Sequence, residues 1–244
     1  EYLSLKDGVS RRTIRIMRRL KIEDMVVSAA PRKSEIVEKS RMKALFSEGR
    51  WKNTLFIWIA MFTNLLSLFS LLQWLPTILE REGMPLEEAN LLVSFMWLIG
   101  ILGALFFAYL SRRASPQRVM AVYLVLSVFF TAALGAAAGE NVVLAWPLII
   151  GIGLTGVSAQ IGFYSLLSEL YPASIRVTGI GVAQGIGRVA AIGGPAIVGV
   201  VLTAGLSHTE IFLWLAAPLL ISAAAVWNVK KAPSSASELN VYEG

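Results

Sequence analysis

Residues 54–79 read TLFIWIAMFTNLLSLFSLLQWLPTIL, and this stretch decides the class of fold because it holds no charged residue. A helix rises about 1.5 Å per residue, so the stretch crosses the roughly 30 Å hydrocarbon core of a bilayer with some tilt. Five further apolar runs follow, near 89–110, 117–138, 142–167, 178–204 and 211–229. The sequence therefore predicts an all-α membrane protein built as a bundle of six transmembrane helices.

The composition divides the chain into a basic head and an apolar body. Hydrophobic residues make up 56% of the 244 residues and charged residues 16%, below the roughly one quarter usual in soluble domains. Fourteen of the 22 Lys and Arg precede Asn53. We expect a cytoplasmic, partly helical segment at 1–52, a transmembrane domain at 53–230 and a cytoplasmic tail at 231–244. Basic residues beside apolar spans indicate a membrane flank rather than a nucleic-acid partner.

Two helices are expected in the basic head. SRRTIRIMRRLKIED, residues 10–24, carries Ile14, Met17 and Leu20 on one face and arginines around it. This pattern fits a helix lying on anionic headgroups, and equally a solvated linker helix. SEIVEKSRMKALFSEG, residues 34–49, forms the second expected helix.

The charges between the runs predict the orientation. If residues 1–52 lie inside the cell, the segments on that side hold 20 Lys and Arg, while the outer loops hold Arg81 alone, among glutamates. Such a bias places both ends of this segment in the cytoplasm.

Polar residues recur at helical spacing on three of the runs. They are Thr63, Asn64, Ser67, Ser70, Gln73 and Trp74 on the first; Gly153, Gly156, Gln160 and Tyr164 on the fourth; and Gly181, Gln184, Arg188 and Pro195 on the fifth. The second run has a weaker face, which contains Trp97, and the third and sixth runs are nearly featureless, as suits lipid-facing helices. Because hydrocarbon offers no hydrogen bonds, the polar faces should turn inward, toward a cavity or, alternatively, toward tightly packed neighbours. Gly181 and Gly185 form a GxxxG match for such packing.

Arg188 lies close to the middle of its run, where a guanidinium is costly and cannot lose its proton. No Asp or Glu lies within the six cores, so the counter-charge must come from elsewhere. Three interpretations remain open: a substrate carboxylate bound by the planar fork of donors, a carboxylate of another polypeptide, or a tether to carbonyls or water.

Enzyme chemistry finds little support in the sequence. Cysteine is absent, and the single histidine, His208, stands beside Ser207 and near Glu210 in a short outer loop. No nucleophile, base and orienting group come together, so we expect no enzyme activity, no metal and no cofactor.

Two stretches resemble the major facilitator superfamily, and within it the aromatic acid:H+ symporter family. SELYPASIRVTGIGVAQGIGRVAAIGGPAIVGVVL, residues 168–202, resembles the junction of the tenth and eleventh helices, and LLQWLPTILEREGMPLEEANLLVSFMWLIGILGALFFAYLSRR, residues 71–113, is similar to the seventh and eighth. The resemblance covers residues 50–229. It implies that the chain is the C-terminal half of a twelve-helix transporter in a bacterial inner membrane, and that its partner is the missing N-terminal six-helix half.

The resemblance also implies roles for individual residues. A small organic anion, such as an aromatic carboxylate, would bind to Arg188, with ring faces and hydrogen-bonding groups from Gln184, Gln160, Tyr164, Trp74, Gln73, Asn64 and Trp97. The proton gradient would drive uptake, although the family's acidic coupling residues lie on the first helix, outside this chain.

A charge latch would control one gate in such a transporter. The family pattern Gly-x-Leu-x-Asp-Arg is replaced here by AYLSRR, residues 108–113, so a modified latch would join Arg112 or Arg113 to Glu169, or Arg176 to Glu169. An ordinary salt bridge at a helix end is an equal alternative.

Two other functions remain open. The same architecture serves carriers of sugars and other metabolites, and the chain could also be an inactive half or an assembly module.

Overall fold

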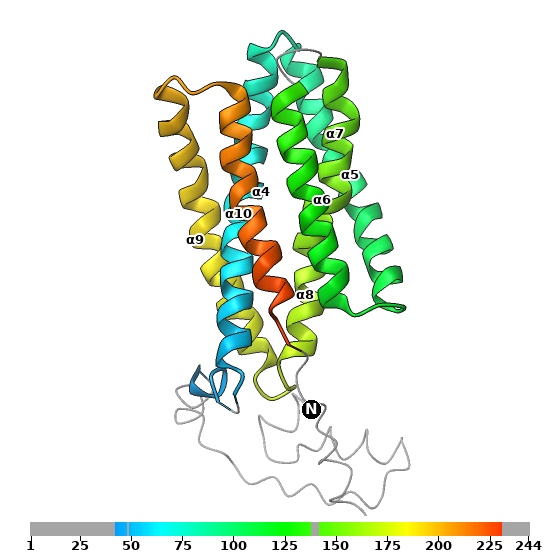
Figure 1. Cartoon of the computed structure of the whole chain (residues 1–244), viewed down its shortest axis with the longest axis vertical. Helices are drawn as coiled ribbons and strands as arrows, with labels where there is room; N and C mark the ends of the chain where they lie inside the picture. The colour runs from blue at the N-terminus through cyan, green and yellow to red at the C-terminus, as the bar shows by residue number, and fades with distance from the viewer. Residues whose placement is uncertain (1–41, 48, 138–141, 231–244) are drawn as a thin grey trace, which may run out of the picture. The chain divides into compact units, whose positions relative to one another are not determined.

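The computed structural model describes residues 42–47, 49–137 and 142–230, and this part of the chain is helical, without a strand (Figure 1). The helices are α4 (Trp51–Arg81), α5 (Leu86–Ser111), α6 (Pro116–Ala137), α7 (Ala145–Ile152), α8 (Ser158–Leu170), α9 (Arg176–Thr203) and α10 (His208–Trp227). A 3-10 turn, η1 (Val142–Leu144), precedes α7, and a π-helical segment, η2 (Gly153–Val157), joins α7 to α8.

Six spans in the described residues are long and apolar enough to cross a membrane, because α7, η2 and α8 form one continuous span. The predicted class, an all-α bundle of six membrane helices, is confirmed. The helices begin and end a few residues from the predicted positions, and α4 extends past its apolar core to Arg81. The expected helix at 10–24, most of the one at 34–49 and the tail at 231–244 lie outside the described residues.

Helix α4 lies at the centre of the bundle, packed along both α9 and α10 and also in contact with α5 and α8. Figure 1 shows α9 and α5 on opposite sides of it. These two helices are the least covered, with 28% of their apolar windows buried against 50% or more for the other spans. The bundle thus leaves two helix faces open, on α5 and α9. The lipid-facing positions expected for α6 and α10, which pack against each other, stay a prediction.

The π-helical segment packs closely against the backbone of α5. A Cβ built on Gly153 would lie 2.5 Å from the carbonyl oxygen of Met96, so a side chain there must displace backbone. From the α5 side, Gly103 meets the backbone of Leu154 as closely. Glycine is therefore needed at 153 because of this approach, and not because a cavity lies beside it.

Hydrogen bonds fasten the end of the bundle where α4 begins. The Asn53 side chain donates to the carbonyl of Lys230 (2.8 Å) and accepts from its N–H (3.0 Å), which ties the chain after α10 to α4. The Tyr171 hydroxyl lies 3.3 Å from Oγ1 of Thr54, which donates to the carbonyl of Leu45. Burial raises the pKa of Tyr171, so the neutral, hydrogen-bonded phenol is favoured.

The residues around His208 have a structural role at the start of α10. The Ser207 side chain accepts from the backbone N–H of Glu210, and the Glu210 carboxylate accepts from the backbone N–H of Ser207 at 2.8 Å. This reciprocal pair is a capping box, which satisfies two N–H groups at the helix start. The spacing of Ser207 and Glu210 is thereby explained without any catalytic chemistry.

Gly153→Ala should lower the free energy of unfolding in detergent by about 1–3 kcal/mol, because the new methyl group meets the backbone of α5. Gly181→Ala is the matched control, since a Cβ at that helical position has nothing within 4 Å. Unfolding followed by tryptophan fluorescence compares the two. Equal midpoints for both variants would show that α5 does not approach η2 this closely.

Candidate functional site

An amide pair joins α4 to α8 in the interior. Asn64 is fully buried on α4, and its Nδ2 donates to Oε1 of Gln160 on α8 at 2.9 Å. The Asn64 Oδ1 is buried as well and has no hydrogen-bond partner among the described residues. Two residues predicted for the same site are thus brought together, from spans that are far apart in the sequence.

A small cavity lies on the other side of Asn64. Its volume is about 10 Å³, close to the minimum for one water molecule. Its lining is Asn64, Ser67, Leu68, Leu71, Ser127, Thr131, Ile152, Gly156, Leu215 and Leu219. Oδ1 of Asn64, Oγ of Ser67 and Oγ1 of Thr131 are all buried without a partner, and three is the usual number of contacts for a buried water. Ser67 therefore belongs to this interior cavity.

Ser70 takes part in packing between helices. A Cβ on Gly194 of α9 would lie 2.5 Å from the Ser70 Oγ and 2.9 Å from the carbonyl oxygen of Leu66, so α9 lies directly against α4 here. Gly187 of α9 meets Leu65 in the same interface. The polar stripe predicted on α4 is therefore divided: part of it faces the small cavity, and part serves close helix packing.

The GxxxG match does not mediate this packing. Cβ atoms built on Gly181 and Gly185 meet nothing within 4 Å, so the expected packing role is wrong for the described bundle. Gly187 and Gly194, seven residues apart on the opposite face of α9, contact α4 instead, and Gly199 meets Trp74 of α4. Spacing alone identifies a small-residue face, but several such faces compete on one glycine-rich helix.

Arg188 is exposed on α9, and its guanidinium carbon lies 5.8 Å from the centre of the Phe69 ring on α4. A cation over an aromatic face is attracted by the ring quadrupole. Within the described residues Arg188 makes this contact and no ion pair. Phe69 was not among the predicted residues, although its position four residues before Gln73 puts both on one face of α4.

One turn before Arg188, Gln184 presents an unused donor. Its Nε2 is buried and has no partner among the described residues. A guanidinium and an amide N–H₂, one turn apart on one helix, together offer hydrogen bonds that the described residues do not accept. This is the chemistry that recognises a carboxylate or another anion.

The aromatic residues of the predicted site have different environments. The indole N–H of Trp74 donates to the carbonyl of Pro195 at 2.8 Å, so this residue links α4 to α9. Trp97 on α5 and Tyr164 on α8 are each 45% exposed, and Gln73 is exposed as well. The contacts described above do not join Trp97 or Tyr164 to Arg188, and a common site for all three stays a prediction.

The residues of the expected latch make other contacts. Arg113 lies over the ring of Tyr109 at 5.0 Å, and Nε of Arg176 donates to the carbonyl of Tyr171 at 3.2 Å. Glu169 and Arg112 are exposed. A gating role for these side chains stays a prediction.

The six apolar spans define an integral membrane protein, and the polar groups that some of them turn inward are typical of proteins that bind solutes within the membrane. Residues 17–195 match the model of the Major Facilitator Superfamily, and the chain belongs to that family.

Three curated relatives illustrate the similarity. The gallate transporter of Pseudomonas putida is 31% identical over 77% of this chain and 42% of its own length. The 4-hydroxybenzoate transporter of Acinetobacter baylyi is 32% identical over 75% of this chain and 40% of its own length. The benzoate transport protein of Acinetobacter baylyi is 28% identical over 76% of this chain and 40% of its own length. The chain thus spans about two fifths of these relatives, and the predicted likeness to aromatic acid transporters is confirmed.

The Asn64–Gln160 bond should be measurable as a coupling of about 0.6 kcal/mol in a double-mutant cycle, the average for interhelical hydrogen bonds in membranes. Asn64→Ala, Gln160→Ala and the double variant are unfolded in mixed micelles, and their free energies are compared. The control cycle combines Asn64→Ala with Gln73→Ala, a change at an exposed glutamine, and should show no coupling. Additive effects in both cycles would mean that the amides do not interact.

Proposed function

We propose that this chain is one six-helix half of a secondary active transporter that takes up an aromatic or related organic carboxylate. The observation that carries the proposal is Arg188, an exposed cation in the middle of a membrane span that forms no ion pair with the described residues. One turn away, the buried Nε2 of Gln184 has no partner in that part of the chain either. The printed names of the relatives support the substrate class, since gallate, 4-hydroxybenzoate and benzoate are each a carboxylate on an aromatic ring.

The position of Arg188 explains why an anion should bind there. It lies about 18 Å along α9 from Arg176, too far from either helix end for its head group to reach water easily. An uncompensated guanidinium at that depth costs at least about 2.5–3.5 kcal/mol, and a bidentate carboxylate would offset much of this cost. Since no Asp or Glu lies within the apolar cores of this chain, an anionic solute meets no competing internal carboxylate.

Neighbouring side chains would orient such a substrate. The guanidinium of Arg188 lies over the Phe69 ring, and its N–H groups would donate to the carboxylate. Nε2 of Gln184, which has no partner among the described residues, would donate to a ring substituent, while Oε1 of Gln160 already accepts from Asn64. Trp74 acts mainly by fixing α9 against α4, because its N–H is already bonded.

A second six-helix half completes the proposed transporter. The chain spans about two fifths of its relatives, and α5 and α9 have the most exposed faces in the bundle. Alternating access would then move the two halves about a site near the middle of the membrane. An inactive half or an assembly module is the second candidate for the chain by itself, and uptake into vesicles that contain only this chain separates the two.

Energy for uptake would come from the proton gradient, with no bound cofactor. The apolar cores contain no group that titrates near neutral pH, so the coupling carboxylate would be supplied by the companion half. We place the protein in a bacterial inner membrane, with both ends of the helical segment cytoplasmic. The charge supports this orientation, since Arg112, Arg113, Arg118, Arg176 and Lys230 follow or precede the helices at one end of the bundle.

Arg188→Lys should lower the uptake of labelled 4-hydroxybenzoate at least about tenfold in cells that express the full-length protein. The substitution keeps the charge but removes the planar fork of donors. Arg81→Lys, at the opposite end of the bundle from the basic loops, is the matched control and should transport normally at equal expression. Unchanged rate and affinity in Arg188→Lys would remove this residue from the site.

Neutral analogues test the substrate class separately. Unlabelled benzoate should compete with 4-hydroxybenzoate for uptake, whereas 4-hydroxybenzyl alcohol, which lacks the carboxylate, should not. Equal competition by both would indicate a carrier for neutral metabolites.

A protonophore should abolish the accumulation of 4-hydroxybenzoate against its gradient, while equilibration across the membrane continues. In vesicles, an imposed gradient with the outside acidic should restore accumulation. Accumulation that survives the protonophore would contradict proton coupling and leave the binding role of Arg188 untouched.

A further inference from the structure

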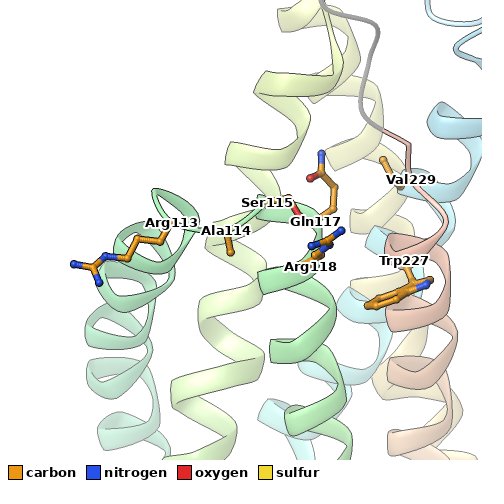
Figure 2. A pocket seen from close by; sticks show the side chains of 7 residues that line it. All are labelled: Arg113, Ala114, Ser115, Gln117, Arg118, Trp227 and Val229. Atoms are coloured by element: carbon orange, nitrogen blue, oxygen red, sulfur yellow. The ribbon is translucent and has the colours of Figure 1, made fainter.

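A basic hollow opens at the end of the bundle where α5 ends, α6 begins and α10 ends. It measures about 670 Å³, and its lining is Arg113, Ala114, Ser115, Gln117, Arg118, Trp227 and Val229. Figure 2 shows Gln117 and Arg118 at the start of α6 on the side that faces Trp227 of α10, while Arg113 projects away from the end of α5. Arg118 is thus the cation that lies between two helices.

Among the described residues that line this hollow, two are basic, Arg113 and Arg118, and none is acidic. The sequence has no Asp or Glu from Ala89 to Gly139, and none from Ile211 to Lys231. Arg118 is exposed and forms no ion pair within the described residues. The positive end of the α6 dipole adds to the field, because the 22-residue helix begins at Pro116. An anion is the ligand that this end of α6 attracts.

An apolar groove adjoins the hollow on the surface of the bundle. It measures about 430 Å³ and runs between α6 and α10, lined by Ala121, Val122, Val125, Leu126, Leu220, Ala223, Ala224 and Trp227. Trp227 lines both the hollow and the groove, so the two lie next to each other. Its ring is 68% exposed, the position in which tryptophan anchors at a membrane interface.

The helical spacing confirms that charge and groove share one face. Arg118, Val122 and Val125 stand at i, i+4 and i+7 on α6. On α10, Leu220, Ala224 and Trp227 stand at the same intervals in the antiparallel direction. A ligand that fits both parts has an anionic end near Arg118 and an apolar chain about as long as two helical turns or more.

We propose that the α6/α10 face is a binding site for a phospholipid with an anionic headgroup. Its phosphate would lie beside Arg118 and the start of α6, and one acyl chain would occupy the groove as far as Val125 and Leu220. Basic pockets between membrane helices are recognised features of such sites. The site is separate from Arg188, which lies on α9, and the proposal does not depend on the transport function.

Native mass spectrometry of the delipidated protein, titrated with dioleoyl phosphatidylglycerol or dioleoyl phosphatidylcholine, tests the proposal. The wild type should bind the anionic lipid more tightly, and Arg118→Gln should weaken that binding about fivefold while leaving phosphatidylcholine unchanged. Arg81→Gln is the matched control, with the same loss of charge at the other end of the bundle, and should behave like the wild type.

A second variant tests the groove. Ala224→Phe adds a ring from an exposed position, so it should fill the groove without disturbing the core, and should weaken the binding of both lipids. Glycerol phosphate, the soluble headgroup analogue, should compete poorly because it cannot use the groove. The proposal is overturned if Arg118→Gln binds the anionic lipid like the wild type, or if the two lipids bind equally. It is also overturned if glycerol phosphate competes fully while Ala224→Phe has no effect, since the hollow then binds free anions only.

Discussion

Hydrocarbon accepts no hydrogen bond, and this constraint governs the arrangement of every polar group in the bundle. The backbone satisfies it by folding into six spans, and the polar side chains satisfy it by turning toward one another or toward backbone carbonyls. Asn64 donates to Gln160, Trp74 to Pro195, and Ser222 to the carbonyl of Ala60. Each of these bonds joins two different spans. These three bonds link α4 to α8, α9 and α10, in addition to the apolar contacts between the helices.

Some of the groups without a partner among the described residues lie where we expect a further ligand. Oδ1 of Asn64 and two hydroxyls converge on a cavity the size of one water. Nε2 of Gln184 and the guanidinium of Arg188 point instead to a solute. Arg118 lies at the boundary between membrane and water, where an anionic headgroup is the nearest available partner. In these proposals, the ligand of each group is inferred from its expected depth in the membrane and from the space beside it.

The class of fold could be predicted almost completely from the sequence, because uninterrupted apolar runs leave few alternatives. The orientation of individual faces could not, since periodicity shows that residues share a face but not what that face contacts. Gly181 and Gly185 match a packing motif yet stand open, whereas Gly187 and Gly194 make the contact with α4. Phe69 was missed because an aromatic residue in an apolar run carries no distinguishing signal. The capping box at Ser207 could also have been predicted from the sequence, because Glu210 stands three residues after Ser207.

The hydrogen bond from Trp74 reaches α9 at Pro195, the position where this helix bends most easily. Proline has no N–H, so the turn of α9 that ends there lacks one hydrogen bond of its own and bends more easily than the rest of the helix. The indole of Trp74 holds the carbonyl of that same residue, and its ring packs near Gly199, just beyond the weak point. The last turns of α9 therefore cannot tilt away alone: they must break this bond or carry the end of α4 with them. Through this one hydrogen bond, bending of α9 at Pro195 is coupled to the position of α4.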